Sequence, residues 1–375
     1  MKTVFVGLSG GVDSSVTAAL LKEQGYNVVG VYMKNWSQDL PGMPCPWRED
    51  FTDAKRVAVQ LGIDFKMYDF EKDYKHKVVD YMLDEFKAGR TPNPDIMCNQ
   101  EIKFKLFLDT ALEDGADLVA TGHYAKTKDG RLFMAKDANK DQTYFLYRVT
   151  SEALEKTLFP LGDLTKPEVR ELAKKFGLVT ATKKESMGIC FVGKVGIKEF
   201  LMQYAEQKPG AIIDQKGREI GQHDGAIFYT IGQRHGLEVG GGLPYYVVGK
   251  DMKKNEIYVT TDLQDEKLWS NQINLIDVHW IAPNPLKDDT LSKVSPYSGL
   301  HPVEGGQGLM VRTRHRAKLI PVKNLKPLTR SGLTIRPDLV REWTAEMGED
   351  VRALTPGQSA VFYTGVEVLG GGIVV

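Results

Sequence analysis

The chain has 375 residues, 42% of them hydrophobic and 26% charged, and its 49 basic and 49 acidic residues give a formal net charge of zero. This length predicts two or three domains, and this composition is typical of a soluble globular protein. Because no apolar run reaches the roughly 18 residues of a membrane span and no signal peptide precedes the first strand, we expect a cytoplasmic protein. Because the net charge is zero, any RNA binding must come from local basic patches.

Up to about residue 205, apolar strand patterns alternate with the 3.6-residue period of helices. Such alternation predicts a Rossmann-like α/β domain, a parallel sheet with helices on both faces and ligands at the carboxyl ends of the strands. The expected strands are 3–8, 27–33, 65–69 and 116–120, and the expected helices are 16–24, 50–61, 74–88, 102–113 and 167–176, the last with Thr165 as its N-cap.

Beyond residue 205 the pattern changes to short β segments with glycine turns, around 211–221, 245–250 and 256–261. Residues 283–285 (PNP) are a predicted linker, and strands continue from Leu309 to the end. A closed barrel would remove the exposed edges of so many short strands. We therefore expect three domains: a catalytic α/β domain over 1–205, a small β-rich central domain over 206–281 and a C-terminal β-barrel over 282–375.

The first strand and first helix are joined by residues 9–15, SGGVDSS. The two glycines let the backbone approach a ligand closely, and the first-turn N–H groups of the helix would point at a phosphate. The serines can add hydroxyl hydrogen bonds, and Asp13 could hold a magnesium ion on the phosphates. The stretch lacks both the P-loop lysine and the GxGxxG spacing, and resembles the SGGxDS loop of ATP pyrophosphatases. The alternative is an ordinary turn that caps a helix.

A second loop, residues 91–98 (TPNPDIMC), is stiffened by two prolines. Asn93 can offer a donor and an acceptor to a base edge, beside a carboxylate and a thiol. Cys98 comes just before a helix that we expect to begin near Asn99, where the helix dipole would favour a thiolate. Good turn chemistry and a buried cysteine are the alternative explanations.

The three cysteines, Cys45, Cys98 and Cys190, are too few and scattered for a disulfide framework, and no C-x-x-C pair indicates zinc. On its own segment, Cys190 is best explained as a core cysteine, although the glycines on either side would let a loop move. Cys45 lies between two prolines, and we interpret it as structural.

Eight motifs occur in one order along essentially the whole chain, and together they resemble the bacterial tRNA-specific 2-thiouridylase family, which replaces the 2-oxygen of the wobble uridine of certain tRNAs with sulfur. The motifs are SGGVDSS (9–15), MKNW (33–36), TPNPD with CN (91–99), TGHYA (121–125), KDQTYFLY (140–147), SMGICFVG (186–193), YTIGQRHGL (229–237) and TPGQSAVFY (355–363). Two departures from the family are His315, where relatives often have an aromatic residue, and Met187, where a threonine is common.

The resemblance implies three groups of site residues and raises both cysteines to catalytic roles, Cys98 as the nucleophile and Cys190 as the carrier of a persulfide. The ATP site would be lined by Gly7, Leu8, Ser9, Gly10, Gly11, Val12, Asp13, Ser14, Met33 and Gly122. The target base would touch Asn93, Pro94 and Asp95, and the rest of the tRNA would touch His123, Lys140, Asp141, Gln142, Arg314, His315 and Gln358.

The chemistry expected from these parts begins with ATP, accompanied by Mg²⁺, adenylating the C2 oxygen of uracil. Cys98 then attacks the Cys190 persulfide and releases hydrosulfide, with Asp95 shuttling protons. This leaves a Cys98–Cys190 disulfide that needs a reductant, whereas direct attack by the terminal persulfide sulfur is an equal alternative. The sulfur donor would be a cysteine desulfurase or a sulfur-relay protein. Rival functions are another adenylating enzyme, such as a lysidine-type or amide-forming synthetase, and a non-catalytic tRNA-binding sulfur relay.

Overall fold

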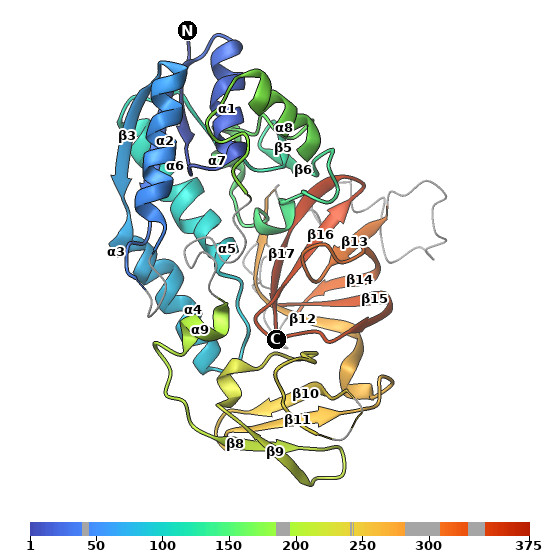
Figure 1. The fold of residues 1–375 in the computed structure, drawn as a ribbon. Coiled ribbons are helices and arrows are strands. Elements are labelled where there is room, and N and C mark those ends of the chain that lie inside the picture. The colour runs from blue at the N-terminus through green and yellow to red at the C-terminus, as the bar shows by residue number, and fades with distance from the viewer. Residues whose placement is uncertain (40–44, 185–195, 241, 243, 282–307, 329–341) are drawn as a thin grey trace.

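The structure is a computed structural model that describes residues 1–39, 45–184, 196–240, 242, 244–281, 308–328 and 342–375. An α/β unit, a small β sheet and a barrel are arranged around a common centre, with the barrel beside the α/β unit and the small sheet below both (Figure 1). Among the described residues, no helix combines the length and apolar character that crossing a membrane requires.

The α/β unit is built on a parallel sheet with the strand order β3-β2-β1-β4-β7. The strands are β1 (Thr3–Gly7), β2 (Asn27–Lys34), β3 (Asp64–Asp69), β4 (Leu118–Ala120) and β7 (Thr157–Leu158), and every pairing is parallel. From β1 the chain adds β2 and β3 on one side of the sheet and then β4 and β7 on the other, so the direction of strand addition switches between β1 and β4. Such a switch point leaves a crevice at the carboxyl ends of the strands. The predicted Rossmann-like sheet is confirmed.

Helices cover this sheet and supply the segments around its carboxyl edge. They are α1 (Val12–Glu23), α2 (Trp47–Leu61), α3 (Glu71–Tyr74), α4 (Tyr81–Lys87), α5 (Pro94–Met97), α6 (Phe107–Glu113), α7 (Ser151–Glu155), α8 (Lys166–Lys175) and α9 (Ile197–Leu201). Two π-helical segments, η1 (Lys75–Asp80) and η2 (Cys98–Leu106), and three short 3₁₀ turns, η3 (Thr143–Phe145), η4 (Ala226–Phe228) and η5 (Glu266–Leu268), complete them. Thr165 is the N-cap of α8, as predicted, and its backbone N–H donates to the Glu168 carboxylate at 2.6 Å.

The small sheet has the order β10-β11-β8-β9. Its strands are β8 (Gly210–Ile213), β9 (Glu219–His223), β10 (Tyr246–Asp251) and β11 (Glu256–Thr260), which overlap the short β segments expected from the sequence.

Six antiparallel strands form the predicted C-terminal barrel. Their order is β12-β15-β14-β13-β16-β17, and the pairing of β12 with β17 closes it. The strands are β12 (Trp269–Trp280), β13 (Leu309–Arg312), β14 (Ile320–Pro327), β15 (Trp343–Arg352), β16 (Ser359–Thr364) and β17 (Glu367–Val374). Because β12 is a barrel strand, the barrel includes residues 269–280, which the sequence-based division had assigned to the central domain.

A hairpin of the α/β unit extends the barrel sheet. Its strands β5 (Lys126–Lys128) and β6 (Arg131–Phe133) pair with each other, and β6 pairs antiparallel with β17. Arg131 strengthens this junction, because its Nε donates to Glu367 Oε1 at 2.6 Å. One buried apolar cluster also runs through all three units, with Phe104, Phe228 and Tyr363 among its members. The units therefore share a core, which holds the carboxyl edge of the parallel sheet against the barrel.

Candidate active site

The loop between β1 and α1 is braced by its own serines. The Ser9 backbone N–H donates to Ser14 Oγ at 3.1 Å, and the Ser14 and Ser15 hydroxyls donate to the Gly11 carbonyl at 3.1 and 2.7 Å. Ser14 and Ser15 are buried, whereas Ser9 is exposed. The two buried hydroxyls thus shape the loop, and the backbone N–H groups of the first turn of α1 remain the main means of binding an anion.

Two glycines allow other segments to lie directly against this loop. Gly10 has a φ of +74°, and a Cβ there would overlap the Asp50 carbonyl at the start of α2. A Cβ on Gly122, just after β4, would lie 2.7 Å from the Ser14 backbone nitrogen. On the other side, a Cβ on Gly7 would lie 2.9 Å from Met33 Cε. Gly122 therefore lies against the loop itself, and Met33 lies beside the strand end that leads into it.

Asp13, in the first turn of α1, is held by two residues that the sequence analysis did not identify. Lys166 Nζ lies 2.7 and 2.8 Å from its two carboxylate oxygens, and the Tyr124 hydroxyl donates to Oδ1 at 3.0 Å. The Lys166 side chain is 12% exposed and brings a positive charge to the edge of residues 9–15, which we call the anion loop. Lys166 directly precedes the predicted helix 167–176, but nothing local links it to a loop 153 residues away.

The Asp13 carboxylate is paired in this structure, with Lys166 Nζ on both oxygens. Asp13 would be open to a magnesium ion only with Lys166 turned away from it, and its role as a magnesium ligand stays a prediction. Within the part of the chain that the structure describes, no three His, Cys, Asp or Glu side chains gather where a metal could bind.

The helix that carries Cys98 begins earlier than predicted. Asn93 is the N-cap, its Oδ1 accepting from the Asp95 backbone N–H at 3.1 Å, and Pro94 occupies the first helical position. The Cys98 backbone N–H donates back to the carbonyls of Pro94 and Asp95. Cys98 is therefore beyond the first turn, to which a helix dipole's effect is confined, and the predicted dipole stabilisation of its thiolate is wrong.

Cys98 itself is 1% exposed and packs in the core shared by the three units. Cys190, its predicted partner, belongs to residues 185–195, which lie outside the described residues, so the predicted pairing stays a prediction. The described residues before and after 185–195 contact the α/β unit. Lys183 Nζ lies 2.8 Å from Asp50 Oδ1, and the Phe200 ring lies 6.1 Å from that of Trp36.

Two residues predicted to contact tRNA are buried. His123 is 8% exposed, with Nδ1 2.7 Å from Thr121 Oγ1 and Nε2 3.4 Å from Lys103 Nζ. Asp141 is 1% exposed and accepts from the Ala135 backbone N–H at 3.0 Å.

The buried carboxylate of Asp141 joins two units of the fold. It also accepts from the Thr143 hydroxyl at 2.8 Å and pairs with Arg312 of the barrel at 3.3 Å. These contacts, and a pKa raised by burial, make Asp141 a structural anchor, and its side chain is not presented to a nucleic acid.

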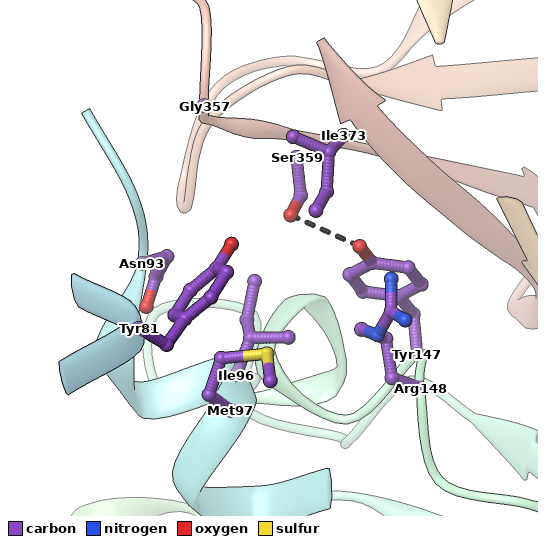
Figure 2. Close-up of a pocket in the computed structure, with 9 residues that line it drawn as sticks. All are labelled: Tyr81, Asn93, Ile96, Met97, Tyr147, Arg148, Gly357, Ser359 and Ile373. Carbon is purple, nitrogen blue, oxygen red and sulfur yellow. Dashed lines mark hydrogen bonds between the residues drawn. The ribbon is translucent and has the colours of Figure 1, made fainter. Parts of the chain in front are cut away.

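Gln358 and Asn93 bring the barrel and the 91–98 loop together. The Gln358 side-chain amide donates to the Thr91 carbonyl at 2.7 Å. Between the two segments is a small pocket that Asn93 and Tyr81 line from one side and Ser359 from the barrel, with the Tyr147 hydroxyl 3.1 Å from Ser359 Oγ (Figure 2).

The remaining predicted tRNA contacts come from two loops. Gln142 accepts from the Tyr124 backbone N–H at 3.0 Å, next to the partly buried Lys140. After β13, Arg314 Nη2 donates to the Ala353 carbonyl at 2.7 Å, and the His315 ring lies 4.5 Å from that of Phe145.

The state of His315 follows from its surroundings. Burial, reinforced by Arg316 and Arg312, lowers the pKa of His315 to about 4. His315 is therefore a neutral, half-buried aromatic ring at the end of a basic segment, suited to stacking.

Family models match the three units in order. They are described as a tRNA methyl transferase HUP domain (residues 2–194), a tRNA methyl transferase PRC-barrel domain (198–261) and an aminomethyltransferase beta-barrel domain (270–374). A solved 4-thiouridine synthetase–RNA complex with bound ATP is 20% identical, covering 49% of this chain and 43% of that one, with a TM-score of 0.34, which is too low to inform function.

Relatives of known activity match almost end to end. The tRNA-specific 2-thiouridylase MnmA of Bacillus subtilis is 46% identical over 378 residues, covering 99% of this chain and 94% of the relative. The tRNA-specific 2-thiouridylase MnmA of Streptococcus sanguinis is 46% identical over 381 residues with the same coverage. Such identity across all three units, together with the match of the family models, shows that the chain belongs to the tRNA-specific 2-thiouridylase family.

Proposed function

We propose that this chain, a tRNA 2-thiouridylase, uses ATP to adenylate the C2 oxygen of the wobble uridine of tRNA and then replaces that oxygen by sulfur from a cysteine persulfide. The products are 2-thiouridine, AMP and pyrophosphate. The observation that carries the proposal is the match of 99% of the chain to tRNA-specific 2-thiouridylases, in a fold whose glycine loop directly follows the first strand of the parallel sheet.

In the first step, the loop around Gly10 and Gly11 holds the phosphates of ATP through the backbone N–H groups at the start of α1. Lys166 pairs with Asp13 in the first turn of α1, and its ammonium can turn from Asp13 to a phosphate oxygen, gaining a charge-assisted hydrogen bond. Met33 and Gly122 would lie along the nucleotide. Mg²⁺ would arrive on the phosphates with ATP, and no step is assigned to Asp13 as its ligand.

The target base would enter beside Asn93, Pro94 and Asp95. Because Asn93 Oδ1 accepts from the Asp95 backbone, its NH₂ group is the part suited to donate to a carbonyl of the base. Adenylation converts the uracil C2 oxygen, a poor leaving group, into part of AMP. Asp95 would move protons at this centre.

The sulfur step uses the two cysteines. A sulfur donor, such as a cysteine desulfurase or a sulfur-relay protein, charges Cys190 with a persulfide. The Cys98 thiolate attacks the Cys190 sulfur bonded to the outer one, and the outer sulfur leaves as hydrosulfide with the bonding electron pair. Hydrosulfide attacks C2, the C2–O bond breaks, AMP departs, and a reductant reopens the Cys98–Cys190 disulfide. Direct attack by the terminal persulfide sulfur uses the same residues.

The tRNA would be gripped across the α/β unit and the barrel. Lys140 and Arg314 can bind phosphates, His315 offers a neutral ring for stacking, and Gln142 and Gln358 offer amides. The wobble base lies in a single-stranded anticodon loop, from which a base can be turned into a pocket at modest cost. A tRNA substrate also fits the predicted cytoplasmic location.

The test is incubation of the protein with ATP, Mg²⁺, sulfide or a persulfide donor and unmodified tRNA, followed by mass analysis of the anticodon nucleosides. We expect 2-thiouridine at the wobble position and tRNA-dependent pyrophosphate release. Cys98→Ser and Cys190→Ser should each abolish the product, and Cys45→Ser is the matched control. A lysidine-type enzyme would turn over normally with both serine variants, and a non-catalytic sulfur relay would release no pyrophosphate.

A further inference from the structure

Lys103 is on the segment that begins at Cys98, the cysteine that attacks the persulfide in the proposed mechanism, and it contacts a residue next to Gly122. It belongs to the π-helical segment η2, which begins at Cys98. Hydrogen bonds in a π-helix join residues five apart, so Lys103 stands one turn beyond Cys98. Its Nζ lies 3.4 Å from Nε2 of His123, and His123 directly follows Gly122, the glycine that lies against the first turn of α1.

The hydrogen bonds of His123 define how this lysine is held. Burial, and then the charge of Lys103, keeps the pKa of His123 well below its usual value, so the ring is neutral. An ammonium group has only donors, so His123 Nε2 accepts from Lys103, and Nδ1–H donates to the Thr121 hydroxyl.

Both ring nitrogens of His123 are thus occupied, and the ring packs against Phe104 and Phe159 at centroid distances of 5.7 and 6.2 Å. The structure therefore favours an indirect role for His123, in place of the tRNA contact expected from the sequence. It acts as a fixed acceptor that aims the half-buried Lys103 ammonium.

We propose that Lys103 is a further catalytic residue, whose ammonium group, positioned by His123, binds the phosphate of the adenylated uridine and stabilises the charge that AMP acquires on leaving. This inference rests on the proposed function. As sulfur bonds to C2, the C2–O bond breaks and AMP takes the oxygen with the electron pair. Lys103 keeps its proton, and nothing beyond the sulfur transfer itself is oxidised or reduced. Preorganised donors at developing charge are typically worth about 10²–10³ in rate.

The test compares Lys103→Met, which keeps the length of the side chain, with Lys103→Arg, which keeps its charge. Lys105→Met is the matched control, because Lys105 is on the same segment, is 58% exposed and forms an ion pair with Glu101 on the helix surface. In thiolation assays with saturating persulfide and varied tRNA, we expect kcat to fall about 100-fold in the methionine variant, with KM for tRNA within about threefold. The arginine variant should recover at least a tenth of the wild-type rate, and the Lys105 control should match the wild type.

A second pair of variants tests the positioning role of His123. His123→Gln keeps an acceptor for Lys103 and should retain more activity than His123→Phe, which keeps only the packing. Wild-type kcat in Lys103→Met, or equal losses in both His123 variants, would overturn the inference while leaving the 2-thiouridylase assignment intact. If the wild-type protein forms no 2-thiouridine under these conditions, the proposed function fails instead.

Discussion

Replacing Gly10 by alanine should lower the free energy of unfolding by about 2–5 kcal/mol and weaken ATP binding. Gly10 has a φ of +74°, and an L residue in the left-handed region costs roughly 1–2 kcal/mol. The new Cβ would also overlap the Asp50 carbonyl oxygen and lie 3.0 Å from its C and Cα atoms. These are main-chain atoms, so α2 must shift, and such overpacking typically costs about 1–3 kcal/mol more.

Gly25 offers a matched control at the other end of α1. Its φ is +85°, and a Cβ there would meet nothing within 4 Å, so Gly25→Ala carries only the conformational cost. Urea denaturation of both variants, with unchanged m-values, gives the difference due to the clash, and titration with ATP shows whether the loop still binds. Equal destabilisation by the two substitutions, together with unchanged ATP affinity for Gly10→Ala, would refute the reasoning.

Three further results are expected. Cys98→Ser and Cys190→Ser should each reduce 2-thiouridine, measured by nucleoside mass spectrometry, below detection while ATP affinity stays at the wild-type value; product from either variant contradicts the two-cysteine mechanism. The affinity for tRNA should fall steeply with salt, and Arg314→Ala should reduce the slope of log K against log salt by about 1, so an unchanged slope removes Arg314 from the interface. Because the pKa of His315 is lowered from 6.5 to about 4 in the folded state, unfolding takes up a proton between these values, and stability falls as pH drops through this window. His315→Phe, which keeps an aromatic ring against Phe145, should lose about 1 kcal/mol less than the wild type between pH 7 and 5 in urea denaturation, after allowance for solvent screening.

Local patterns predicted most of the architecture. Residues 4–7 and 28–33 are continuous apolar runs, as strands buried on both faces must be, and they lie in β1 and β2. Thr165 followed by Pro167 and Glu168 marked the start of α8, because capping depends on residues within one turn.

The error at Cys98 was also a local one. Asn93 is an N-cap and Pro94 is the first helical residue, a start signal of the same kind as Thr165 and Pro167 in α8. The rigidity of the two prolines instead favoured a loop in the sequence-based interpretation. Read as a helix start, the same residues place Cys98 beyond the first turn.

The sequence by itself determined the main buried strands, the longer helices and the glycine loop, because each depends on neighbours within a few positions. Tertiary structure alone decided which polar groups bind one another: Lys166 reaches Asp13 across 153 positions, and Arg312 reaches Asp141 across 171. Residues so far apart meet only when the sheet and the barrel close on a shared core, and no local periodicity encodes that meeting. For this reason the sequence suggested an RNA contact at Asp141, where folding forms a buried ion pair with Arg312.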